Sequence, residues 1–270
     1  PKKIDFLMIE NLEIKEINDN NAWDKFIISS ENKNIFSISE FIENYNYQKK
    51  KFFIKKKEEI LASFHLFIKD DQIFRGDNVD SSINYKKFDK VNNSSLIYKK
   101  FYLIQKYSNF LIENFKGGNL VLDHHTNDLR PFNWYNFDKK KNVFKLDANY
   151  TTIINISKSL NTLKDLEKSS FYQNLSRSIK QQFSKTKKEN IKLREENNFD
   201  LAINLIKKTF ERQNQTINFD IESLFATYRK LHKKGFIKMY VSSIDKLDTS
   251  FTIFGVVGNN AVYLNGGRLL

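Results

Sequence analysis

Two adjacent histidines, His124 and His125, follow Asp123 at the end of a short apolar run. A carboxylate and two imidazoles are potential metal ligands, and α/β folds place functional groups at the ends of strands. Neighbouring side chains on an extended backbone point in opposite directions, so the two imidazoles are poorly placed to share one ion. The pattern therefore favours a loop pair or a single substrate contact, and we predict no metal site.

Motifs for nucleophilic or phosphoryl-transfer chemistry are missing from the sequence. It contains no G-x-S-x-G elbow, no H-E-x-x-H helix and no P-loop. The absence of cysteine excludes disulfides, thiol nucleophiles and cysteine zinc sites. Acyl transfer to an amine is compatible with this sequence, because it needs alignment, a proton acceptor and hydrogen-bond donors that face the developing oxyanion.

The formal net charge of +13 favours an anionic partner, although a genome-wide nucleotide bias toward lysine explains the charge equally well. The clearest basic cluster is the segment 171–188. Its apolar residues recur at every fourth position, at Phe171, Leu175, Ile179 and Phe183. This spacing predicts a helix that docks by its apolar stripe and presents cations to phosphates or another polyanion. A solvated face of an ordinary amphipathic helix is the alternative.

Two lysine triplets, at 49–51 and 55–57, bracket an apolar strand. Lysines on an exposed sheet edge hinder pairing with other chains. We therefore predict that these lysines protect an edge strand.

The elements that would position these residues follow one order twice. In the first half we predict a strand, two helices and three strands, over 12–17, 21–28, 38–45, 52–56, 60–68 and 72–76. In the second half the same order covers 191–195, 199–213, 221–234, 236–242, 250–257 and 261–265. The last three strands of the second half have short connections, which predicts an antiparallel meander. We infer a pseudo-duplicated α/β chain without a residue-level repeat.

Several helix ends are marked by their residue types. Asp220 is a good N-cap for the helix over 221–234, and Gly235 is a typical residue just after a helix. In the first half, Ser37 or Ser39 is expected to cap the second helix.

The first copy is expected to continue beyond its three strands. A helix over 97–115 is predicted to stop at Gly117 and Gly118, a buried strand to follow at 119–123, and a loop or short helix at 128–134. The second copy reaches Leu270 before any such helix and strand, so we expect an incomplete second lobe. The predicted division is a first lobe at 1–155, followed at 156–270 by a basic linking helix and the second lobe.

This element order resembles the acetyltransferase-like (GNAT) fold, and the tandem arrangement resembles the FemAB-like aminoacyltransferases. The likeness extends from about Trp23 to the end of the sequence. The segments that carry it are 128–137, 150–157, 177–185, 210–213 and 261–267. It implies tandem GNAT-like lobes with mixed, mostly antiparallel sheets. It also implies an acyl-CoA or aminoacyl-tRNA donor and an anionic small-molecule or lipid-linked precursor as acceptor.

The resemblance implies substrate contacts near the ends of two elements. Arg130 and Trp134 lie in an aromatic segment, and Arg212 and Gln213 end a predicted helix. For Trp134 the alternative is core packing, and for Arg212 it is solvation of the helix end.

Five further positions follow from the same resemblance. Arg177 and Lys180 match a basic helical segment that contacts an anionic substrate or tRNA. Gly266 and Gly267 occupy the place where such folds cradle the acyl carrier, although the full Q/R-x-x-G-x-G/A turn is absent. Tyr263 is a candidate proton donor to the leaving group, or else an aromatic residue of the strand.

The favoured function is acyl or aminoacyl transfer to an amino group of a sugar-nucleotide or cell-envelope precursor. The alternatives are a non-catalytic module that binds nucleic acid or another polyanion, and a pseudoenzyme on the same fold. No apolar run reaches the roughly 18 to 20 residues that a membrane helix needs, and the first residues lack a signal peptide's apolar segment, so we expect a cytoplasmic protein. The sequence does not predict the oligomeric state.

Overall fold

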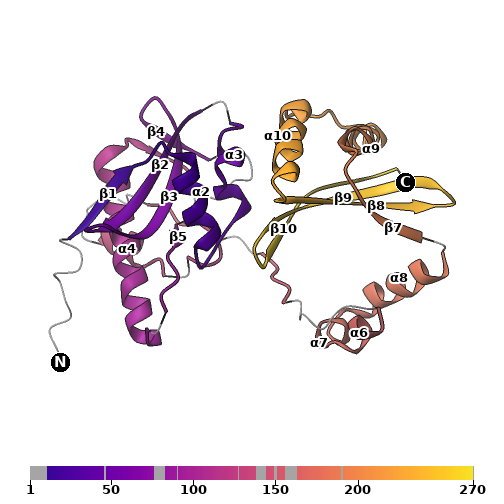
Figure 1. The fold of residues 1–270 in the computed structure, drawn as a ribbon, viewed down its shortest axis with the longest axis horizontal. Coiled ribbons are helices and arrows are strands. Elements are labelled where there is room, and N and C mark those ends of the chain that lie inside the picture. Colours follow the sequence, from indigo (N-terminus) through magenta and orange to yellow (C-terminus); the bar gives the residue numbers. More distant parts are fainter. Residues whose placement is uncertain are drawn as a thin grey trace. The chain divides into compact units, whose positions relative to one another are not determined.

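The fold contains two β-sheets, each accompanied by helices (Figure 1). The computed structural model describes residues 11–45, 47–75, 83–89, 91–126, 128–137, 144–148, 151–155, 163–189 and 191–269. The six-stranded sheet has the order β1-β2-β3-β4-β6 with β5 paired to β3, and the four-stranded sheet has the order β10-β9-β8-β7. The predicted mixed α/β fold with two mostly antiparallel sheets is confirmed.

The first sheet and its helices are built from the first half of the chain. The strands are β1 (Leu12–Glu16), β2 (Gln48–Lys56), β3 (Glu59–Lys69), β4 (Gln72–Phe74), β5 (Asn84–Tyr85) and β6 (Gly117–Gly118). The helices are α2 (Asn20–Ser29), the 3-10 helix η1 (Ile35–Ser37), α3 (Ser39–Ile42), α4 (Asn93–Asn114) and α5 (Arg130–Phe137).

The second half repeats the topology of the first. Three helices come first, namely α6 (Leu163–Lys168), α7 (Ser170–Gln173) and α8 (Arg177–Lys188). The repeat itself consists of β7 (Ile191–Glu196), α9 (Phe199–Arg212), α10 (Ile221–Lys233), β8 (Ile237–Ile244), β9 (Leu247–Val257) and β10 (Asn260–Arg268). In both copies the first strand lies beside the strand that follows the two helices, and the last three strands form a meander.

The chain divides into two compact units that are not continuous in sequence. Unit 1 comprises 1–146, 220–237 and 254–263, and unit 2 comprises 147–219, 238–253 and 264–270. Within unit 1, the Ser223 hydroxyl donates to Asn44 Oδ1 at 3.0 Å, and Lys234 Nζ donates to Glu40 Oε2 at 2.6 Å. The lobe boundary expected at residue 155 stays a prediction.

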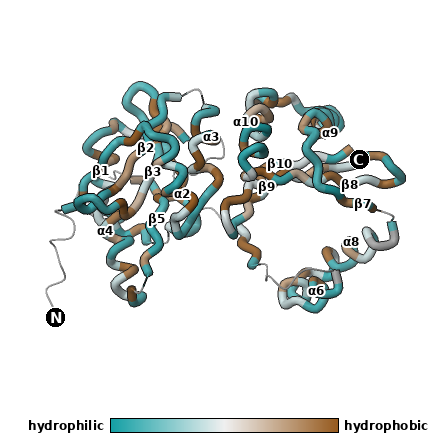
Figure 2. Tube along the Cα trace, in the orientation of Figure 1, coloured by the Kyte–Doolittle hydropathy of each residue, from teal (hydrophilic) through white to brown (hydrophobic). Residues whose placement is uncertain are grey.

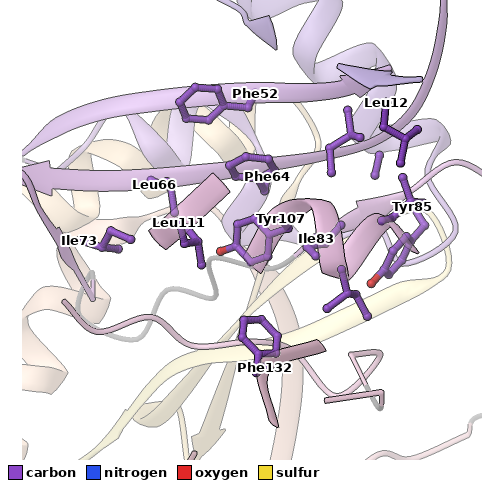
Figure 3. Packing of buried hydrophobic residues seen from close by; sticks show 14 of the residues in the cluster. Leu12, Phe52, Phe64, Leu66, Ile73, Ile83, Tyr85, Tyr107, Leu111 and Phe132 are labelled. Carbon is purple, nitrogen blue, oxygen red and sulfur yellow. The ribbon is translucent and has the colours of Figure 1, made fainter. Parts of the chain in front are cut away.

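Strand β3 is buried on both of its faces. On one face Phe64 packs against Tyr107 of α4, with ring centroids 4.6 Å apart (Figure 3). On the other face His65 meets the edge of Trp23 from α2, with ring centroids 6.4 Å apart. Each fully buried large apolar side chain contributes about 1.5–3 kcal/mol. The hydrophobic colour along most of β3 in Figure 2 fits this central position.

The prediction that the lysine triplets protect a sheet edge is wrong. Strand β2 holds residues 49–51 and lies between β1 and β3, so it is not an edge strand. Lys51 is only 6% exposed, and its ammonium group contacts the side-chain oxygen of Asn20 and lies 3.5 Å from Glu43. These polar partners offset the cost of burying its charge.

Helix α3 does not start with the predicted serine cap. Its N-cap residue is Ile38, which makes no side-chain hydrogen bond to the helix. Instead, the backbone N–H and the hydroxyl of Ser39 both donate to the Asp24 carboxylate, at 2.7 and 2.6 Å. A carboxylate on the neighbouring helix is a stronger acceptor than a local hydroxyl, so it fixes this turn.

The glycine pair after α4 forms a strand and does not end the helix. Helix α4 stops at Asn114, and Gly117 and Gly118 pair in parallel with β4. Gly118 has φ +132, and a Cβ atom there would lie 2.0 Å from the carbonyl oxygen of Ile73. The strand predicted at 119–123 is not formed, although the Asn119 N–H still donates to the Ile73 carbonyl at 2.9 Å.

The buried His65 makes stability depend on pH. Its two ring nitrogens have no hydrogen-bond partner in the described part of the chain, and burial, reinforced by the charge of Lys51, lowers its pKa to about 3. As the pH falls from 6.5 toward 3, the unfolded chain takes up a proton that the folded protein does not. Stability is therefore fully present above pH 6.5 and falls by about 1.4 kcal/mol per pH unit in this window.

We expect His65→Leu to remove this part of the pH dependence and to be at least as stable as the wild type at pH 7. The apolar side chain has no proton to bind and leaves no buried polar atom without a partner. Urea unfolding at several pH values between 4 and 8 measures the effect, and the exposed His124→Gln serves as the control. An unchanged slope in His65→Leu would contradict the assignment.

Candidate functional site

A cavity of about 380 Å³ lies in unit 1 beside α4, β5 and the segment that precedes α5. Its lining residues are Tyr85, Leu96, Ile97, Lys100, Ile104, His125 and Asp128. Leu96, Lys100 and Ile104 follow one another at four-residue spacing, so they share one face of α4. The cavity thus has an aliphatic side with one cation, and a polar side formed by the other elements.

Tyr85 brings a buried phenol to this cavity. Its backbone is held at both ends, because its N–H donates to Asn32 Oδ1 and its carbonyl accepts from Glu31 N–H, both at 2.8 Å. Its hydroxyl makes no hydrogen bond of acceptable geometry with the described residues. Burial, together with the charge of Asp123, raises the pKa of Tyr85 far above its usual value, although the Thr126 side chain opposes this rise. The phenol is therefore neutral at physiological pH.

Asp123 shapes the turn that presents the histidines. Its Oδ1 accepts from the backbone N–H of His125 at 3.0 Å and from the Thr126 hydroxyl at 3.2 Å. Its Oδ2 accepts from Asn32 Nδ2 at 3.2 Å. The expectation that His124 and His125 point apart is wrong, because the backbone turns here and the ring centroids lie 4.0 Å apart.

The two histidines differ in their surroundings. His124 is exposed, whereas His125 is partly buried and lines the cavity. Burial lowers the pKa of His125, and the charges of His124 and Lys100 lower it further, although Asp123 and Glu31 oppose them. The His125 imidazole is therefore neutral at pH 7 and has one nitrogen with a free lone pair for accepting a proton.

Arg130 and Trp134, both predicted substrate contacts, come together near the polar side of the cavity. Arg130 binds the Asp128 carboxylate through Nε at 2.8 Å and Nη2 at 2.6 Å. These bonds lower the pKa of Asp128. The guanidinium group lies 4.9 Å from the ring centroid of Phe101 and 5.7 Å from that of Trp134. Trp134 is 51% exposed, so core packing does not explain it, whereas Phe132 is 2% exposed and belongs to the core.

Arg177 and Lys180 lie on α8 in unit 2, and the predicted continuous helix is broken. Helix α7 ends at Gln173 and α8 begins at Arg177, with Ser176 as N-cap accepting from Ile179 N–H at 3.4 Å. The four-residue apolar stripe therefore does not run along one helix. Lys180 Nζ donates to the carbonyl of Gln173 at 2.7 Å, which ties α8 to α7.

The remaining predicted residues of unit 2 lie near Thr209 of α9. Arg212 ends this helix, and Gln213 is its C-cap with its N–H bonded to the Thr209 carbonyl at 3.3 Å. The Thr209 hydroxyl lies 2.9 and 3.0 Å from the backbone oxygen and nitrogen of Arg268.

The two glycines of β10 precede Arg268 directly. A Cβ atom at Gly267 would lie 2.7 Å from Phe251 and 3.2 Å from Thr209 Oγ1, so close packing alone requires glycine there. Gly266 is its neighbour on the strand, and a carrier-binding role for both glycines stays a prediction.

Tyr263 lies elsewhere on β10, is 62% exposed, and has its ring 6.3 Å from that of Phe254. This position does not distinguish a role of Tyr263 as a proton donor from that of an ordinary aromatic residue on a strand.

Sequence reasoning missed Tyr85 and Lys100. Lys100 had a local signal, because a lysine stands between Leu96 and Ile104 on an otherwise apolar helix face. Tyr85 had none, because its burial depends on the register of β5 against β3, where it lies opposite Ala62.

Comparison with known proteins identifies the fold. No protein-family model and no curated protein matches this chain. Among solved structures, the crystal structure of FemX is similar, with a TM-score of 0.57 and 13% sequence identity. The match covers 95% of this chain and 80% of the FemX chain. The protein therefore has a FemX-like two-lobe fold.

Among the described residues, none of the helices combines the length and the apolar character that a membrane-spanning helix requires.

We expect substitutions of two neighbouring aromatic residues to have different effects. Phe132→Ala should reduce the free energy of unfolding by about 3–5 kcal/mol, because it removes a core ring and leaves a cavity. Trp134→Ala should change it by no more than about 0.5 kcal/mol, because that ring is half exposed. Chemical unfolding of both variants tests this. A loss of stability in Trp134→Ala equal to that in Phe132→Ala would assign Trp134 to the core.

Proposed function

We propose that the protein is an acyl- or aminoacyltransferase that acts on an amino group of a sugar-nucleotide or cell-envelope precursor. The observation that carries the proposal is the repeated strand, helix, helix and meander topology, which occurs in a FemX-like fold. The sequence resemblance to FemAB-like aminoacyltransferases supports the same class of reaction. Such transfer needs few dedicated groups, because positioning and oxyanion stabilisation supply much of the rate.

The donor proposed is acyl-CoA or aminoacyl-tRNA. Gly266 and Gly267 of β10 are the proposed carrier contacts. Arg212 and Gln213 lie at the end of α9, and Thr209 of this helix is hydrogen-bonded to Arg268 of β10. Arg177 provides a cation on α8 for the phosphates of a substrate or tRNA. Lys180 adds a second positive charge, although its ammonium group also donates to the carbonyl of Gln173 in α7.

The acceptor is proposed to be an anionic small molecule or a lipid-linked precursor that carries a primary amine. The cavity beside α4 is the proposed acceptor site, with Arg130 and Trp134 near its polar side. An exposed guanidinium group stacked on aromatic rings provides a flat, cationic surface for such a substrate.

A donor screen tests the proposed reaction. We expect the protein to bind an acyl thioester or a charged tRNA by calorimetry, and to transfer the acyl group to an amine, as detected by mass spectrometry. If the folded protein neither binds nor turns over any such donor but still binds polyanions, a polyanion-binding module is the correct function instead.

Charge substitutions on α8 separate a substrate-binding role from a structural role. We expect Arg177→Gln with Lys180→Gln to weaken binding of tRNA and to reduce the salt dependence of its affinity, because fewer counterions are released. Thermal stability should change little, since Arg177 is exposed and the Lys180 hydrogen bond to Gln173 lies at the surface. Binding at several salt concentrations and thermal unfolding are the measurements. A loss of stability without any change in the salt dependence would show that the residues are structural.

A further inference from the structure

The cavity beside α4 presents an imidazole that makes no side-chain hydrogen bond with the described residues. His125 lines the cavity and is partly buried. The Tyr85 hydroxyl also lacks such a bond, but Tyr85 is 0% exposed, so a ligand in the cavity cannot reach this oxygen. A ligand that donates a hydrogen bond to the His125 ring would give the imidazole a partner.

The charges around the cavity favour a cationic ligand. Its cations are each paired, Lys100 with Glu31 at 2.7 Å and Arg130 with Asp128 at 2.6 Å. Asp123 adds a further carboxylate, whose charge raises the pKa of both Tyr85 and His125. Three carboxylates against two cations leave one net negative charge while His125 is neutral. A monocation is therefore stabilised there, and a phosphate dianion is repelled.

The other side of the cavity is aliphatic. Leu96, Ile97 and Ile104 line it, and Ile97 is half exposed. These side chains offer contact to a short alkyl chain but no hydrogen bond. A primary ammonium group on an alkyl chain matches both sides of the cavity.

We propose that this cavity binds the primary ammonium group of the acceptor substrate and that His125 removes its proton. This inference rests on the transferase function proposed above. In the complex the ammonium group donates to the lone pair of His125. Its alkyl chain lies against Leu96, Ile97 and Ile104.

The proposed step is balanced in protons and bonds. His125 accepts one proton from the ammonium group, which frees the lone pair of the amine nitrogen. This nitrogen then forms a bond to the acyl carbon, while the bond from that carbon to the oxygen or sulfur of the carrier breaks. The proton on His125 passes to the leaving oxygen or sulfur, so the imidazole returns to its neutral form. The acylated nitrogen loses its second proton to water as the amide forms.

Binding of simple amines tests the cavity without any acyl donor. We would titrate the intact protein, labelled with ¹³C in its histidine rings, with n-butylamine, n-butanol, butyrate and inorganic phosphate. The expected result is a saturable shift of the His125 signal with n-butylamine alone, and a pKa of His125 that falls further when the cation is bound. The groups that face this ring are Asp123, His124, Lys100 and Glu31, and they are the same in every titration.

Matched variants locate the site. His125→Gln should abolish saturable binding, whereas His124→Gln should leave it unchanged. Butyrate or phosphate binding more tightly than n-butylamine, or an effect of His124→Gln equal to that of His125→Gln, would overturn the proposed amine site.

The test also separates this inference from the transferase function. Amine binding at His125 without acyl transfer from any donor would overturn the function and leave the amine site. Acyl transfer at the wild-type rate in a folded His125→Gln variant would overturn the proton-acceptor role and leave the function. A pH profile of transfer that shifts in His124→Gln but not in His125→Gln would also overturn that role.

Discussion

Burial of β3 on both faces is the constraint on which the first sheet depends. A strand covered on both sides must pair on both edges and must receive helices on both faces, because its backbone and side chains have no access to water. β2 satisfies one edge, β4 and β5 share the other, and α2 and α4 cover the faces. The register of β5 then fixes Tyr85 opposite Ala62. The candidate site is therefore anchored to a strand whose central residues are buried.

Much of the fold was predictable from local patterns. Apolar periodicity located most helices and strands, and Asp220 and Gly235 act as the predicted cap and helix-ending residue, the latter with φ +80. Repetition of the element order then predicted two sheets of the same topology. Two of the failures depended on partners from other elements. Asp24 took over the cap of α3, and the carboxylate of Glu43 and the side chain of Asn20 allowed Lys51 to be buried.

The candidate site was only partly predictable for the same reason. Asp123, His125, Arg130 and Trp134 were recognised from residue types within a short segment, although their individual roles required the turn and the Asp128 pairing to be seen. Tyr85 and Lys100 reach the cavity from other elements. A sequence pattern identifies chemically capable residues, but the burial that leaves a phenol without a partner arises only in the packed structure.

The discontinuous makeup of unit 1 has a consequence for how the protein folds during its synthesis. Ser223 and Lys234 supply partners for Asn44 and Glu40, and residues 254–263 also belong to unit 1. These segments leave the ribosome long after the first sheet is complete. At that stage Glu40 of α3 still lacks its ionic partner Lys234. Completion of unit 1 therefore follows synthesis of residues 220–263, so residues 1–146 do not form the whole of this unit by themselves.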